Sequence, residues 1–160
     1  MSGGEEPIID ISSDQYFMGE ALREAMKAYK REEVPIGAVI VHGSEIIARA
    51  YNQVELLQDA TAHAEMLCIT QAEAAMGGWR LTDCTLYVTK EPCPMCAGAV
   101  VHARLSRVVF GLGDPKGGAA GGALNLLDFD GLNHKAIVTQ GVLQEECHQI
   151  IKAFFAERRG

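Results

Sequence analysis

The sequence predicts an α/β protein built on a mixed sheet of about five strands with helices on both faces. Three observations predict it. Runs suited to β-strands alternate with segments of helical periodicity along most of the 160 residues. Hydrophobic residues make up 48% of the chain, and no internal repeat divides it. A chain of this length buries about 68–70% of its unfolded surface, so it needs no disulfide to hold a core.

The first part of the chain predicts a helix after a short lead. Residues 1–11 are expected to be a loose lead, and residues 12–160 one domain. Ser12, with Gln15 three residues later, resembles a capping box that opens a helix. Apolar residues recur at helical spacing after it. We expect the helix to run to about Glu33, before the following proline stops it.

A hairpin and a second helix are predicted next. The β-rich runs 36–41 and 45–51 are joined by the turn residues His-Gly-Ser, which favours a β-hairpin. A polar loop then leads to Thr61, an expected N-cap for a helix over 62–76. Two glycines after that helix are typical of a helix end.

The rest of the chain continues the alternation. In order, we predict a strand at 85–89, a helix at 94–104, a strand at 107–111, a glycine-rich loop at 112–135, a strand at 136–139 and a final helix. Proline at the first position of the helix at 94–104 is favourable. A loop as long as 112–135 inside a compact domain is usually functional or disordered.

Composition excludes several classes of protein. The chain has 14 Lys and Arg against 21 Asp and Glu, a net charge of −7, which argues against a protein that coats nucleic acid nonspecifically. A local basic rim is still compatible with this charge, because distant charges are screened beyond about 8 Å. No apolar leader is visible, and the apolar run 34–41 is too short to cross a bilayer. We therefore expect a soluble, cytosolic protein with no membrane contact.

The five cysteines are an odd number spread along the chain, which is not the pattern of a disulfide framework. An odd number fits a reducing compartment instead. Three of them are expected to be small buried hydrophobes: these are Cys68, Cys84 and Cys147.

The other two cysteines belong to a predicted metal site. His63 and the pair Cys93 and Cys96 each stand at the start of a predicted helix. Because Cys93 and Cys96 are three residues apart, their sulfurs lie on one face of a first helical turn, where the helix dipole favours thiolate. One imidazole and two thiolates suit Zn²⁺ in tetrahedral geometry. Three protein ligands with an open fourth position are typical of catalytic zinc.

Glu65 is the expected proton carrier beside this site. A step of two residues along a helix is a rotation of roughly 200°, so His63 and Glu65 point to different sides of it. Both can reach the same metal ion only if the ion lies over the N-terminal end of the helix. Glu65 would then stand near the metal's water without binding the metal. A carboxylate there could take a proton from the water and return it to a leaving group, worth about 10²–10⁴ in rate.

The two motifs together resemble a known superfamily. H-x-E with a later P-C-x-x-C is the signature of zinc nucleobase deaminases. The chain further resembles the bacterial tRNA adenosine deaminases of the cytidine-deaminase superfamily, from about residue 14 to 159. The segments that carry the resemblance are 61–65 (TAHAE), 85–89 (TLYVT), 91–99 (EPCPMCAGA), 107–111 (RVVFG) and 118–121 (GAAG). The resemblance implies a three-layer α/β/α cytidine-deaminase-like fold with a mixed five-stranded sheet.

The resemblance also implies a function and its residues. Members of that family convert adenosine to inosine at the wobble position of a tRNA anticodon stem-loop, as homodimers with one zinc ion per subunit. His63, Cys93 and Cys96 would hold the zinc, and Glu65 would move protons. The expected substrate-binding residues are Asn52, Ile36, Ala64, Asp114, Lys116, Phe155, Arg158 and Arg159. Taken without the resemblance, these eight are ordinary turn, core and helix-end residues.

Several positions depart from the family pattern. Gln53 and Gly113 stand where basic residues are familiar, and Lys90 stands where an aliphatic one is familiar. Asp128 and Phe129 replace histidines found in some members. The absence of basic residues at these two positions would change tRNA affinity and tRNA choice, but not the deamination chemistry. Lys90 could compensate as a phosphate contact.

Two alternatives stay open at the level of sequence. The first is a zinc deaminase of a free base or nucleoside, such as a guanine or cytosine compound, which the acidic net charge favours. The second is a thiol–disulfide oxidoreductase that uses Cys93 and Cys96, because Cys-x-x-Cys between a strand and a helix fits that chemistry too. The second alternative leaves His63 and Glu65 unexplained.

Overall fold

The computed structural model describes residues 13–159, which form a mixed five-stranded sheet in the order β2-β1-β3-β4-β5. The strands are β1 (Gly37–His42), β2 (Glu45–Tyr51), β3 (Cys84–Lys90), β4 (Arg107–Leu112) and β5 (Ile137–Gln140). The helices are α1 (Asp14–Lys30), α2 (Val54–Leu57), α3 (Ala64–Met76), α4 (Pro94–Ala103) and α5 (Gln144–Arg159). β1 pairs antiparallel with β2 and β3, while β3–β4 and β4–β5 are parallel. The predicted mixed sheet is confirmed.

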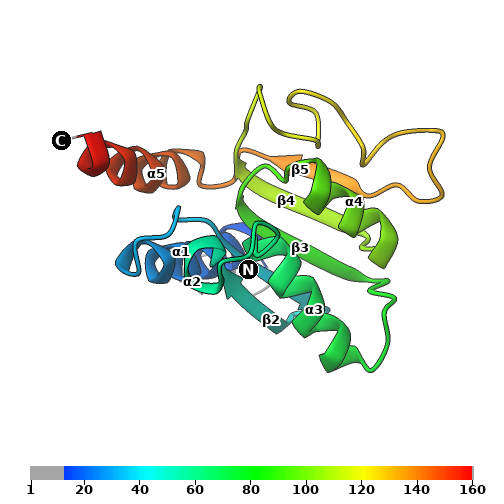
Figure 1. The fold of residues 1–160 in the computed structure, drawn as a ribbon. Helices are drawn as coiled ribbons and strands as arrows, with labels where there is room; N and C mark the ends of the chain where they lie inside the picture. The colour runs from blue at the N-terminus through cyan, green and yellow to red at the C-terminus, as the bar shows by residue number, and fades with distance from the viewer. Residues whose placement is uncertain (1–12, 160) are drawn as a thin grey trace, which may run out of the picture.

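Helices cover both faces of the sheet (Figure 1). Because side chains alternate along a strand, successive residues of β3 enter different cores. Leu86 packs with α3 and α4, whereas Tyr87 packs with α1 and α5. The three layers α/β/α follow, and they place the beginnings of α3 and α4 on the same side of the sheet. The three cysteines outside the metal motif are buried, as expected.

The ends of α1 differ from the sequence prediction. The predicted cap Ser12 lies outside the described residues, and the Oγ of Ser13 accepts the Tyr16 N–H at 3.1 Å. The helix ends at Lys30, not at Glu33. Glu32 has a left-handed φ of 64°, which turns the chain out of the helix. Glu33 is then buried and accepts backbone N–H groups from α2.

The second helical region also differs. The predicted polar loop contains the short helix α2, and α3 begins with His63, not Thr61, as its N-cap. Thr61 is not the cap because its N–H and its hydroxyl both donate to the Asp59 carboxylate at 2.8 Å. The predicted loop after β4 is mainly turns, with one isolated bridge between Ala120 and Asn125.

Candidate active site

Two helix beginnings bring the predicted metal ligands together. His63 is the N-cap of α3 and Cys93 the N-cap of α4, with Cys96 in the first turn of α4. The His63 Nδ1 lies 3.6 Å from the Cys93 Sγ and 3.5 Å from the Cys96 Sγ. All three ligand atoms lie within 4.8 Å of one another. One ion could therefore contact all three.

The donor set fits zinc. One imidazole and two sulfurs are soft to borderline ligands. Among residues 13–159, no further His, Cys, Asp or Glu joins this cluster, so a tetrahedral ion would keep one open position. This arrangement matches catalytic zinc sites and not closed structural ones.

Electrostatics at the three ligands also favour a cation. Hydrogen bonds with Cys96 and His63 lower the pKa of the Cys93 thiol to about 3. The same bond to Cys93 raises the pKa of His63, while burial opposes that rise. The Cys93 sulfur, followed by burial, raises the pKa of Cys96. These shifts favour a negative charge on the Cys93 sulfur, and a bound cation would favour thiolate at both cysteines.

Glu65 stands in the first turn of α3 and is only 4% exposed. Burial raises the pKa of its carboxyl to about 7, with the imidazole of His63 opposing the rise. A general acid–base group works best when its pKa is near the working pH. Glu65 is therefore suited both to accept and to donate a proton.

These groups line a cleft of about 590 Å³. His63, Ala64 and Glu65 line it together with Cys93. A cleft of this size is large enough for a nucleobase with its ribose. The cleft therefore contains both part of the metal-ligand cluster and the buried carboxyl of Glu65, whose pKa is raised.

Comparison with known proteins decides the family. The family model of the MafB19-like deaminases matches residues 11–159. A tRNA-specific adenosine deaminase from Bacillus subtilis is 56% identical over 149 residues, 93% of this chain and 92% of that protein. The chain belongs to the MafB19-like deaminases, among the tRNA-specific adenosine deaminases. The predicted family is confirmed.

Solved structures support this deaminase assignment. A structure from a study of A-to-I editing by tRNA:A34 deaminases at the wobble position of transfer RNA superimposes with a TM-score of 0.81. Its sequence is 44% identical, and the match covers 84% of this chain and 98% of that one. A guanine deaminase from Nitrosomonas europaea, 23% identical, matches 95% of this chain and 89% of its own with a TM-score of 0.78. The latter shows the shared fold alone.

The structure brings most of the expected substrate-binding residues of this deaminase to the cleft. Five of the eight line it: Ile36, Asn52, Ala64, Asp114 and Arg158. Asn52 follows β2 and is 6% exposed. Its side-chain amide donates to the Val34 carbonyl at 3.3 Å, which fixes its orientation.

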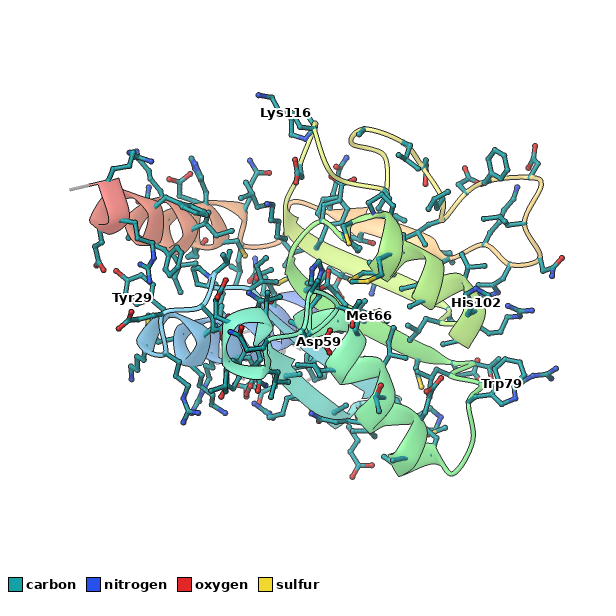
Figure 2. The ribbon with its side chains drawn as sticks, viewed as in Figure 1. Tyr29, Asp59, Met66, Trp79, His102 and Lys116 are labelled. Atoms are coloured by element: carbon teal, nitrogen blue, oxygen red, sulfur yellow. The ribbon has the colours of Figure 1, made fainter. Side chains whose placement is uncertain are left out.

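The other three expected residues do not line the cleft. Lys116 is exposed at the tip of the loop after β4 and points away from the molecule (Figure 2). Phe155 is 42% exposed, while its neighbour Phe154 is 3% exposed and lines the cleft. Arg159 is exposed at the end of α5. These residues could meet only the outer parts of a long substrate.

Sequence reasoning missed several cleft residues. Phe154 lines the wall, and the Arg158 guanidinium lies 3.5 Å from the centroid of its ring. Lys90, which the sequence had suggested as a phosphate contact, also lines the cleft, and so do the buried carboxylates Glu33 and Glu91, which the sequence had not indicated. The stripe of the last helix could have indicated Phe154, but no local pattern indicates that a carboxylate will be buried.

Within residues 13–159, no helix combines the length and the hydrophobicity needed to cross a membrane.

Proposed function

We propose that residues 12–160 are a zinc deaminase domain that converts adenosine to inosine at the wobble position of tRNA. One observation carries the proposal: the ligand atoms of His63, Cys93 and Cys96 lie within 4.8 Å of one another, beside a cleft that His63, Cys93 and Glu65 line. Similarity to tRNA-specific adenosine deaminases over nearly the whole chain supports tRNA as the substrate.

Each group at the base of the cleft then has a role. His63, Cys93 and Cys96 would hold one zinc ion per subunit. When bound, zinc lowers the pKa of a water ligand to about 7 and so supplies a nucleophile at neutral pH. Overall, water oxygen replaces the amino group on C6 of adenine, and ammonia leaves. Glu65 would accept the proton of the water and deliver a proton to the departing nitrogen.

The cleft walls would hold the adenosine. Ile36 and Ala64 offer an apolar surface to the base, and the Asn52 amide can hydrogen-bond to a base or ribose. Asp114 and Arg158 would contact the sugar and phosphate of the same nucleotide. Reaching the floor of the cleft requires an unstacked nucleotide, and anticodon-loop bases are unpaired and easily extruded.

The residues outside the cleft would contact the flanking anticodon nucleotides. Lys116, Phe155 and Arg159 are exposed on the loop after β4 and on α5, the same two elements that contribute Asp114 and Arg158 to the cleft. An aromatic side chain there can stack on a splayed base, and the cations can meet phosphates. An anticodon stem-loop would reach them, whereas a free base would not.

We also propose that the enzyme is a cytoplasmic homodimer, as its family resemblance implies. A hollow between α3 and α4 on the outer surface supports self-association. Met66, Trp79 and His102 line it, and Trp79 is 52% exposed (Figure 2). Apolar surface around such a hollow is typical of the faces through which proteins associate when it forms a contiguous patch. Sedimentation of the wild type and Trp79→Glu tests this: we expect a dimer that dissociates in the variant.

A substrate panel tests the activity. The zinc-loaded protein is incubated with an anticodon stem-loop that carries a wobble adenosine, and separately with free adenosine, guanine and cytidine. We expect inosine in the stem-loop and no turnover of the free compounds. Turnover of guanine or cytidine without editing of the stem-loop would establish the free-base alternative. A protein that lacks zinc and carries a reducible Cys93–Cys96 disulfide would establish the oxidoreductase alternative.

A further inference from the structure

The buried carboxylate of Glu91 gathers three backbone N–H groups from the loop after β4. Glu91 directly follows the last residue of β3 and is 5% exposed. Its Oε1 accepts the Asp114 N–H at 2.8 Å. Its Oε2 accepts the N–H groups of Ala120 at 2.9 Å and Gly122 at 2.7 Å. One side chain thus ties both ends of the segment 114–122 to the sheet.

The loop is packed closely around this carboxylate. A Cβ added at Gly118 would lie 2.2 Å from the Glu91 Cδ. A Cβ added at Gly122 would lie 2.2 Å from the Asp114 carbonyl oxygen and 2.7 Å from the Glu91 Oε1. Real Cβ contacts are longer than 3.0 Å, so any larger residue at either glycine forces something to move. These glycines let the backbone approach the carboxylate.

The same segment presents Asp114 to the cleft. The Asp114 Oδ1 accepts the N–H groups of Lys116 at 3.1 Å and Gly117 at 2.9 Å. Its Oδ2 lies 3.4 Å from the Lys90 Nζ. Asp114 and Lys90 line the cleft whose floor holds His63. The Glu91 carboxylate, through the loop backbone, therefore fixes where this charged pair stands relative to the metal ligands.

We propose that Glu91 is a positioning residue for RNA binding: it holds the segment 114–122 so that Asp114 faces the bound nucleotide. This inference rests on the proposed function for its substrate. Glu91 does not touch the reacting atoms in this role. Without its carboxylate the loop samples other conformations, and the apparent affinity for RNA falls by the fraction of molecules that keep the binding conformation.

Glu91→Gln is the variant that tests this role. Glutamine has nearly the same shape but offers one acceptor oxygen, and its NH₂ group points at backbone donors. We expect the KM for an anticodon stem-loop to rise about tenfold or more, which corresponds to losing one charge-assisted hydrogen bond. We expect kcat to stay within about threefold and zinc content to stay unchanged, because Glu65 and the metal ligands are untouched.

Glu24→Gln is the matched control. Glu24 is also buried, at 2% exposure, and its carboxylate is paired with Lys27 at 2.9 Å and Arg49 at 3.4 Å. It lies on α1 and does not line the cleft. We expect this control to lower the melting temperature while KM for the stem-loop stays at the wild-type value. The comparison separates positioning from a general effect of losing a buried carboxylate.

Hydrogen exchange of the substrate-free proteins provides a second measurement. We expect faster exchange at residues 114–122 in Glu91→Gln than in the wild type, and wild-type exchange there in Glu24→Gln. The proposal is overturned if Glu91→Gln exchanges at the wild-type rate in this segment, or if it loses stability with KM unchanged. A wild-type protein that forms no inosine would instead overturn the proposed function, while the exchange result would still decide whether Glu91 holds the loop.

Discussion

Gly118→Ala tests how closely the segment 114–122 packs around Glu91, because it adds one methyl group there. The new Cβ would lie 2.2 Å from the Glu91 Cδ and 2.4 and 2.5 Å from its two oxygens. The Glu91 carboxylate must retreat by about 1 Å or more to restore ordinary contact at 3.4 Å. Bonds of 2.7–2.9 Å to three N–H groups do not survive such a shift together. The backbone φ at Gly118 is outside the left-handed region, so the clash alone is tested.

The expected loss of stability follows from these contacts. Overpacking costs about 1–3 kcal/mol, and each buried N–H left unpaired costs about 1–3 kcal/mol. Because the loop can relax, we expect the substitution to lower the free energy of unfolding by about 2–4 kcal/mol in total. For a protein of this size that lowers the melting temperature by roughly 5–12 °C. Differential scanning calorimetry of the zinc-loaded proteins measures it.

Gly19→Ala is the matched control for that substitution. Gly19 lies inside α1, and a Cβ added there meets nothing within 4 Å. Alanine is favoured over glycine inside a helix by about 0.5–1 kcal/mol, so this variant should melt slightly above the wild type. If Gly118→Ala melts within about 1 °C of the wild type, the loop is not packed around Glu91 as described and the reasoning fails.

The remaining predictions concern the metal centre, one ion pair and one cleft lysine. Glu65→Ala should keep its zinc but lose inosine formation by at least about 100-fold, measured by metal analysis and by sequencing of edited RNA. Cys93→Ala should lose zinc on dialysis, because only two of the three ligands remain; full retention would argue against this site. The hydrogen bonds of Arg107 to Asp14, at 2.9 and 2.7 Å, lower the pKa of the Asp14 carboxyl below its ordinary 3.8. Asp14→Asn should therefore lower the free energy of unfolding by about 1 kcal/mol near pH 7. This difference from the wild type should disappear as the pH falls below about 4, because the Asp14 carboxyl is then protonated. Lys90→Leu should reduce the slope of log affinity for RNA against log salt by about 0.7 if Lys90 contacts one phosphate.

The metal centre could be predicted from sequence because its geometry is local. Cys93 and Cys96 share one helical turn, and a helix beginning favours thiolate whatever the rest of the fold does. His63 and Glu65 likewise share the start of one helix. The long-range condition for this prediction was that α3 and α4 begin on the same side of the sheet, and the structure shows that they do.

The cleft walls could not be predicted in the same way. Glu33 bonds to backbone 22 and 23 residues later, and Glu91 to backbone 23 to 31 residues later. A carboxylate that satisfies distant N–H groups leaves no period or spacing in the sequence. For Glu33 the consequence was a misplaced helix end, because the helical pattern of α1 continues past Lys30 while the chain does not.

In the last helix, α5, two neighbouring phenylalanines have different surroundings. Phe154 and Phe155 both fit an apolar stripe, yet α5 turns Phe154 into the cleft and leaves Phe155 42% exposed. Helical spacing identifies a face to within about one position, and tertiary packing chooses between neighbours. Phe154 therefore lines the cleft wall, while a contact between the exposed Phe155 and the substrate stays a prediction.

The predicted catalytic residues and the cleft walls should therefore respond differently to substitution. Under the proposed function, substitutions at His63, Glu65 or the cysteine pair of α4 would change the chemistry directly. The walls come from separate segments, and buried carboxylates hold two of them: Glu33 at α2 and Glu91 at the 114–122 loop. Under the proposed function, replacing a wall segment would alter which RNA binds while His63 and Glu65 stay in place, provided that the carboxylate beneath that segment keeps its backbone partners. Under the proposed function, substrate choice would depend on two buried acids, Glu33 and Glu91, that hold the cleft walls from beneath.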